Sequence, residues 1–154
     1  MREHEHNRPD DTVEVDLGAL LVDISDLVED HVEKAAARDI SHALAMVSLP
    51  NDAALAALTD QLLTHCKTLA VGVTLIPEDR CPPQAAAAVR TWRKLVKDGP
   101  DDGTFGNWHY ARALARAARD MLKGIRVNRT QRPEQPATFV GRKTMPPLPA
   151  TEQP

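Results

Sequence analysis

The fold is decided by residues 51–77, which read NDAALAALTDQLLTHCKTLAVGVTLIP. The apolar side chains in this stretch recur every three or four residues, and this spacing places them on one face of a helix. The members of this face are Leu55, Leu58, Leu62, Cys66, Leu69, Val73 and Ile76. The stretch therefore predicts a helix that Asn51 or Asp52 caps, that Pro77 ends, and that other helices must cover.

Two further helices are predicted on either side of this stretch. The first follows Asp16 as its cap, ends before Pro50, and is either one long helix or two helices broken near Arg38-Asp39. Its apolar face, which the other helices are expected to cover, continues from the first set below through Ala35 or Ala36 to the second. The first set is Leu17, Leu20, Leu21, Ile24, Leu27, Val28 and Val32, and the second is Ile40, Ala43, Leu44 and Val47. The third helix begins at Pro82-Pro83 and ends at Asp98-Gly99-Pro100. It is expected to bury Ala85, Val89, Trp92, Leu95 and Val96.

A fourth helix is expected to begin near Asn107, and Gly124 marks its end. Its apolar face consists of Ala111, Leu114, Ala118, Met121, Leu122 and Ile125. Four amphipathic helices joined by short loops predict an all-α, up-down four-helix bundle over residues 16–125. Residues 1–15 are expected to form a disordered acidic arm, and residues 126–154 a disordered, basic, Pro-rich tail.

Composition favours helix and excludes several classes of protein. Aromatic residues make up 3% of the chain, so the core is expected to be aliphatic, and clusters of alanine favour helix. The charged N-terminus lacks the apolar segment of a signal peptide, and no run approaches 18 apolar residues. The two cysteines, Cys66 and Cys81, have the spacing of neither a disulfide framework nor a metal site. We therefore expect a cytoplasmic protein with no membrane partner.

Charge is unevenly divided along the chain. Residues 1–80 hold 16 acidic and 6 basic residues, net −10, whereas residues 81–154 hold 6 acidic and 13 basic residues, net +7. Either the two halves face each other within one fold or a dimer, or the basic half meets a polyanion such as nucleic acid. The candidate polyanion contacts share one face of each of the last two helices: Arg90, Arg93, Lys94, Lys97, Arg112, Arg116, Arg119 and Lys123. The alternative is a solvated face that pairs with acidic residues of the first helix.

The sequence contains no recognisable catalytic or cofactor-binding motif. It lacks a nucleophile elbow, a phosphate-binding loop and a dinucleotide fingerprint. His4-Glu5-His6 and the pair Asp39–His42 each offer fewer than the three or four ligands that a metal site needs. His65 is expected at the edge of the core, hydrogen-bonded to a neighbouring helix, and it points about 100° away from Cys66. We therefore expect no cofactor, no metal and no enzymatic activity.

A family resemblance covers roughly residues 40–125. Leu58-Thr59, Leu62, His65 and the sequence Leu75-Ile76-Pro77-Glu78 resemble the pattern LTxxLRGHxxLLIPEVE of small helical actinobacterial proteins of unknown function. Some of these proteins are tagged as natural-product-biosynthesis proteins. The chain departs from the pattern at Thr64, where glycine is usual, and has extra residues before Ile76-Pro77. The resemblance implies a helical fold and brings no catalytic residues.

Three functions remain compatible with the sequence. The first, which we favour, is a non-catalytic interaction or regulatory module that binds a protein partner or itself. The second is a nucleic-acid-binding regulator that uses Arg112, Arg116 and Arg119. The third is an accessory enzyme or small-ligand carrier, which requires a polar-lined cavity between helices.

Overall fold

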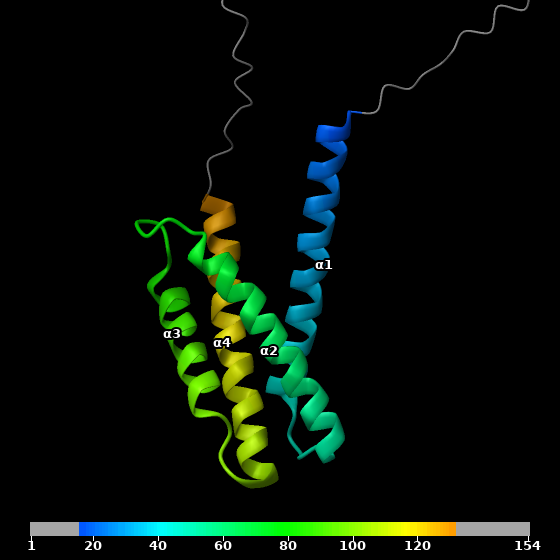
Figure 1. Ribbon diagram of the computed structural model, residues 1–154, viewed down its shortest axis with the longest axis vertical. Helices are drawn as coiled ribbons and strands as arrows, with labels where there is room; N and C mark the ends of the chain where they lie inside the picture. Colours follow the sequence, from blue (N-terminus) through cyan, green and yellow to red (C-terminus); the bar gives the residue numbers. More distant parts are fainter. Residues whose placement is uncertain (1–15, 132–154) are drawn as a thin grey trace, which may run out of the picture.

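The computed structural model describes residues 16–131, which form four α-helices (Figure 1). The helices are α1 (Leu17–Ala45), α2 (Asp52–Thr74), α3 (Pro83–Asp98) and α4 (Gly103–Gln131). The all-α prediction is confirmed, and α1 is one continuous helix through Arg38-Asp39. The expected arm at residues 1–15, with His4-Glu5-His6, lies outside the described residues, as does the expected tail from residue 132 onward. Within residues 16–131, none of the helices is long and apolar enough to cross a membrane.

The helix ends follow the capping residues that the sequence indicates. The Asp16 carboxylate accepts hydrogen bonds from the N–H groups of Gly18 and Ala19 at the start of α1. The Asn51 side chain accepts one from the N–H of Ala54 at 2.8 Å, which caps α2. Helix α3 begins at Pro83 and ends before Gly99, whose φ of 71° is a conformation that glycine adopts readily.

Helix α4 lies at the centre of the bundle. It packs against α1, α2 and α3, and its contact with α2 is the most extensive. Helices α1 and α3 lie on opposite sides of this central pair and do not contact each other (Figure 1). The bundle is therefore flattened, and the other helices cover α1 and α3 on one side only.

The core lies between α2 and α4, as residues 51–77 predict. Leu55, Leu58, Leu62, Cys66, Leu69, Val73 and Ile76 are all buried. Leu62 is fully inaccessible, and Leu114 and Met121 of α4 are equally buried. Alanines fill much of the remaining space on α4, so the helices approach one another closely.

Both expected ends of the fourth helix are wrong. The helix begins at Gly103 instead of near Asn107, and it continues to Gln131, so residues 126–131 belong to the helix and not to the tail. Gly124 does not end the helix. A Cβ atom at this position would collide with the Cβ atom of Ala85, so the glycine permits the close approach of α3 and α4.

Several residues expected in the core lie elsewhere. Val96 at the end of α3 is half exposed, and Trp92 and Leu95 are partly buried. Val47 is 98% exposed because α1 ends two residues before it. The largest departure concerns the N-terminal half of α1.

Candidate interaction surface

The N-terminal half of α1 presents a row of large apolar side chains to solvent. We call Leu17, Leu20, Leu21, Ile24, Leu27 and Val28 the α1 stripe. Each of these side chains is between 44% and 69% exposed, so the expectation that they are buried is wrong. Figure 1 shows this part of α1, in blue, standing apart from the other three helices. A contiguous apolar surface of this kind is typical of an interaction site.

The α1 stripe does not continue the buried face of α1. The C-terminal half of the helix buries Ala36, Ile40 and Ala43 against the bundle. Ile24 precedes Ala36 by twelve residues, which places the two about 120° apart around the helix axis. The buried apolar line therefore extends toward the N-terminus through Glu33 and Glu29 and leaves most of the α1 stripe on another side of the helix, with Leu21 at its border in line with the buried Asp39.

Acidic residues occupy the positions where α1 faces α4. Glu33 accepts hydrogen bonds from Arg129 and from Nε of Arg126, and Glu29 lies 3.8 Å from Arg129. The hydrogen bond to Glu33 raises the pKa of Arg129, although burial opposes this effect. Because both arginines are half exposed, these pairs stabilise the contact only modestly. The middle of α1 is thus attached to α4 by ion pairs of Glu29 and Glu33, and the apolar side chains of its N-terminal half remain exposed.

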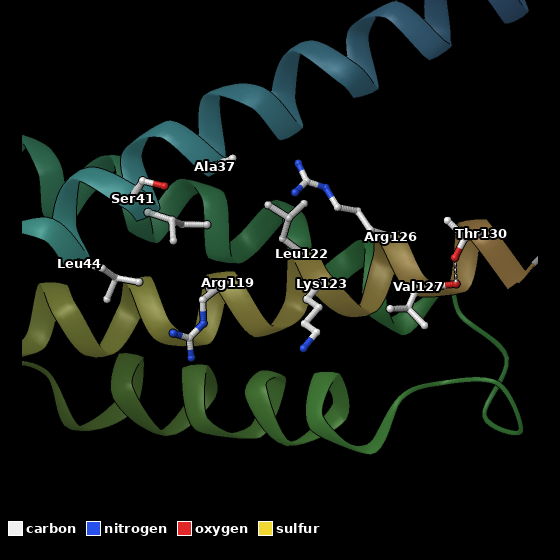
Figure 2. A pocket seen from close by; sticks show the side chains of 10 residues that line it. Ala37, Ser41, Leu44, Arg119, Leu122, Lys123, Arg126, Val127 and Thr130 are labelled. Carbon is white, nitrogen blue, oxygen red and sulfur yellow. Dashed lines mark hydrogen bonds between the residues drawn. The ribbon is translucent and has the colours of Figure 1, made fainter.

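A groove of about 410 Å³ separates α1 from α4 (Figure 2). Its lining includes Ile40, Leu44, Leu122 and Val127, with three basic residues at the edge. In Figure 2, the side chain of Arg126 extends toward α1, whereas those of Arg119 and Lys123 extend toward α3. The charges therefore do not converge on the groove, and its lining is largely apolar.

The candidate polyanion contacts on α4 are divided between structural and exposed positions. Arg112 is partly buried, donates a hydrogen bond to the Met46 carbonyl at 3.0 Å, and lies over the ring of Trp108. It holds the end of α1 against α4. Arg119 is exposed and forms an ion pair with Asp120 at 3.0 Å. Arg116 and Lys123 are also exposed on this helix.

The candidate contacts on α3 are all exposed, and none of them forms an ion pair within the described part of the chain: Arg90, Arg93, Lys94 and Lys97. Since α1 and α3 do not touch, the acidic residues of α1 do not pair with them. Of those acidic residues, Glu33 pairs with Arg126 and Arg129, and Glu29 pairs with Arg129. The structure leaves polyanion binding by these residues as a prediction.

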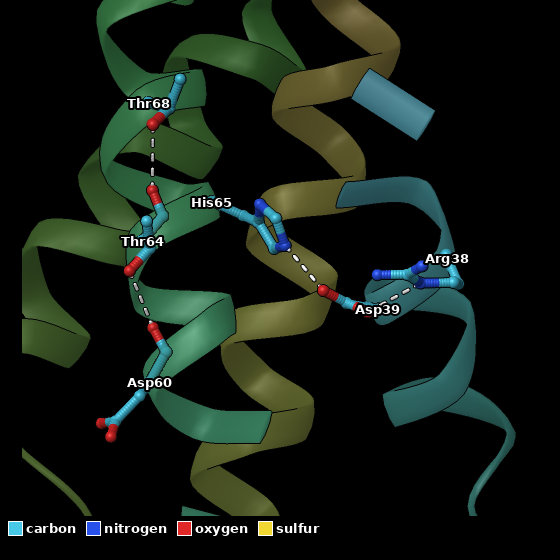
Figure 3. A network of polar contacts seen from close by, with 6 residues as sticks. All are labelled: Arg38, Asp39, Asp60, Thr64, His65 and Thr68. Atoms are coloured by element: carbon cyan, nitrogen blue, oxygen red, sulfur yellow. Dashed lines mark hydrogen bonds and ion pairs between the residues drawn. The ribbon is translucent and has the colours of Figure 1, made fainter. Parts of the chain in front are cut away.

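His65 forms the interhelical hydrogen bond that the sequence predicts (Figure 3). Its Nε2 atom lies 2.8 Å from Oδ2 of Asp39 on α1, and both side chains are mostly buried. An ionised carboxylate can only accept, so Nε2 carries the proton. Burial would raise the pKa of Asp39, but the hydrogen bonds from His65 and Arg38 outweigh it, and the pKa lies below its usual 3.8. The pair connects α1 to α2.

Within residues 16–131, Cys66 is not set up as a nucleophile, and Asp39 and His42 do not form a metal site. The Cys66 thiol donates to the Leu114 carbonyl at 3.4 Å, and burial raises its pKa to about 12, so it is not a nucleophile at neutral pH. Asp39 is engaged by His65, and His42 is exposed on the surface of α1. Among residues 16–131, no three His, Cys, Asp or Glu side chains come together as metal ligands.

The exposure of the α1 stripe was missed, although the sequence contains a signal for it. Between Val28 and Ala36, the apolar residues move to a different angle around the helix axis. Toward the N-terminus, the angle that Ile40 occupies is instead held by acidic residues. A single straight helix cannot bury both apolar sets against the same neighbours. The shift therefore indicates two faces with different partners.

The comparisons with known proteins identify a family but no function. Residues 34–129 match a family of unknown function, DUF6415. The chain belongs to this family. The matched region covers the four-helix body from the middle of α1 and does not include the α1 stripe. No curated protein and no solved structure matches the chain.

Proposed function

We propose that the protein is a non-catalytic interaction module of the cytoplasm, and that the α1 stripe is its docking surface. The observation that supports this function most directly is the exposure of six large aliphatic side chains along one side of α1. Exposure of such side chains to water is unfavourable. Each side chain that a partner covers contributes about 1–2 kcal/mol to the free energy of binding. A rigid, amphipathic helix that projects from a bundle suits recognition by a partner helix or an apolar groove.

The charges on α1 support a protein partner over a lipid surface. Asp23, Asp26 and Asp30 lie on the polar side of the same helical segment. Helices that bind membrane surfaces usually carry lysine and arginine there, because lipid headgroups are often anionic. The acidic polar face of α1 would be repelled by such a surface.

The test is an affinity capture from native cell extract treated with nuclease. We compare the wild-type chain with the double variant Leu21→Glu/Ile24→Glu and with Val71→Glu, which changes a similarly exposed residue of α2. The proposal predicts that the double variant loses the captured proteins and that Val71→Glu retains them. Identical captures by all three chains would contradict it.

A second candidate function, binding of nucleic acid, is favoured by the exposure of the basic residues on α3. Arg90, Arg93, Lys94 and Lys97 are exposed on a helix that does not contact the acidic helix α1, so α1 does not neutralise them. Binding through them predicts that the logarithm of affinity for a DNA duplex falls linearly with the logarithm of salt concentration. Lack of binding at 20 mM salt, in an assay that detects affinities of about 100 µM, would exclude this candidate.

The biological process that we propose is actinobacterial natural-product biosynthesis. The support is the resemblance of residues 58–78 to small helical proteins with that tag. Deletion of the gene in the native host should change the profile of secreted secondary metabolites. An unchanged profile under producing conditions would contradict this assignment.

A further inference from the structure

We infer that the partner of the α1 stripe is a second copy of this chain, paired antiparallel over residues 17–28. This inference rests on the proposed interaction function and names its partner. It follows from three properties of the stripe: its area, the spacing of its side chains and the position of the nearby acidic residues.

The area of the α1 stripe matches a small, reversible dimer. Six side chains that are 44–69% exposed offer about 600 Å² per copy, or about 1,200 Å² for two copies, which is the lower limit of standard interfaces. Interfaces of this size without large aromatic anchors bind weakly. A dissociation constant in the micromolar range is therefore expected.

The spacing of the stripe is that of a helix-pairing seam. Leu17, Leu21, Ile24 and Val28 alternate steps of four and three residues, as residues of a two-helix seam do. In an antiparallel pair centred between Val22 and Asp23, Leu21 meets Ile24 of the partner subunit. Leu17 then meets Val28 of the partner subunit, so every seam position is apolar.

The residues beside the seam favour the antiparallel orientation. Leu20 and Leu27 flank the seam on one side, and Gly18 and Ser25 on the other. A parallel pair would place the leucine flank of one helix against the flank with Gly18 and Ser25 on its partner. An antiparallel pair places the two leucine flanks together, so that Leu20 lies near Leu27 of the partner subunit. The antiparallel orientation therefore buries more apolar surface, and the helix dipoles oppose each other favourably.

The acidic residues of α1 do not oppose pairing of two copies. Asp26 lies about 160° from Ile24 around the helix axis, and Asp23 lies about 100° from Ile24, at the outer edge of the leucine flank about 40° from Leu27. These carboxylates therefore point away from the seam, where water screens them. Glu29 and Glu33 are already paired with Arg129 and Arg126 of the same chain. Two copies thus meet through apolar side chains without confronting their negative charges.

The first test measures the mass of the purified full chain by sedimentation equilibrium between about 1 and 200 µM. The mass is expected to rise from 16.9 kDa to 33.8 kDa, which is twice the chain mass. Leu21→Glu/Ile24→Glu should remain a monomer throughout, while Val71→Glu should dimerise like wild type. Circular dichroism melting of each variant verifies that the bundle is folded. A wild-type monomer at every concentration, or dimerisation by the double variant, would overturn the inference.

The second test determines orientation with cysteines in a Cys81→Ser background, where Cys66 is fully buried. Mixing Leu21→Cys with Ile24→Cys should give at least a five-fold excess of the mixed disulfide over either homodimer. Predominant homodisulfides would overturn the antiparallel register. A monomer in which maleimide fails to label Ile24→Cys would mean that another segment of the same chain covers the stripe, and the second-copy inference would be wrong.

The two proposals fail in different ways. A monomeric chain that captures proteins through the α1 stripe disproves the second-copy inference and retains the interaction function. A monomeric chain whose captures do not depend on the stripe disproves both.

Discussion

The two halves of α1 belong to one uninterrupted helix but contact different surroundings. The C-terminal half buries small residues, Ala36 and Ala43, against the bundle. Its buried carboxylate, Asp39, accepts hydrogen bonds from His65 and Arg38. Glu29 and Glu33, near the middle of α1, face the bundle, and the N-terminal half exposes larger aliphatic residues on another side. The comparison teaches that the apolar pattern identifies a helix reliably, whereas the position of the stripe around the helix decides which surface it contacts.

The largest expected difference is between Leu62→Asp and Leu21→Asp. Leu62 is fully buried between α2 and α4, so a carboxylate there lacks water and partners and should cost about 4 kcal/mol or more, enough to unfold the bundle. Leu21 is 65% exposed, so the same change should alter the free energy of unfolding by about 0.5 kcal/mol or less in the monomer. Thermal melts followed by circular dichroism at 1 µM measure both. Equal destabilisation would show that the N-terminal half of α1 is packed.

The same substitution within α1 sharpens the comparison further. Ala36 is completely buried, so Ala36→Leu should overpack the contact with the bundle and cost about 1–3 kcal/mol. Ala19 is exposed in the N-terminal half, so Ala19→Leu should be nearly neutral. Urea denaturation gives both free energies. A neutral Ala36→Leu would mean that α1 does not approach α4 as closely as its alanines imply.

The Asp39–His65 pair predicts a pH dependence that belongs to the C-terminal half of α1. Because the pKa of Asp39 is lower in the folded state, the ionised carboxylate stabilises the fold above its unfolded pKa of 3.8. This stabilisation is lost as the pH falls through the lower folded pKa. The free energy of unfolding of Asp39→Asn, subtracted from that of wild type, should therefore shrink below pH 3.8. A difference that is constant with pH would contradict the ionised pair.

The smallest expected change is in the reactivity of the two thiols. Burial holds the pKa of Cys66 at about 12, whereas Cys81 lies in a partly exposed loop before α3. A thiol reagent at pH 8 should modify Cys81 within minutes and reach Cys66 only as the bundle opens. Ala36→Leu should accelerate modification of Cys66, and Ala19→Leu should not. Rapid modification of both thiols in the wild-type chain would contradict the packing of α2 on α4.

Much of the body of the fold is predictable because its residues serve a single purpose. The apolar spacing from Leu55 to Val73 fits only a helix that is covered on one face. Asp16 and Asn51 mark the starts of helices because their side chains cap the first turn by hydrogen bonds. The end of α4 was wrongly predicted at Gly124 because glycine can either end a helix or permit a close contact between helices. Only the position of Ala85 distinguishes these two roles. The exposure of the α1 stripe was missed because its residues and those around Ile40 were assigned to one continuous apolar face, despite the shift of phase between Val28 and Ala36.

The candidate site was harder to predict than the fold. His65 was placed correctly because a polar residue beside an apolar face needs a partner nearby, and Asp39 supplies it. The surroundings of the basic residues depend on the flattened arrangement that separates α1 from α3. Their distance from the acidic helix is a property of tertiary packing that spacing alone does not contain.

Amide hydrogen exchange along α1 at two protein concentrations tests the central claim most directly. The account predicts that amides of residues 36–43 are protected at both 1 µM and 200 µM, because they lie in the packed half of the helix. Amides of residues 20–28 should exchange rapidly at 1 µM and become protected at least ten-fold at 200 µM, when a second copy covers the α1 stripe. Equal protection of both halves in the dilute sample would contradict the account.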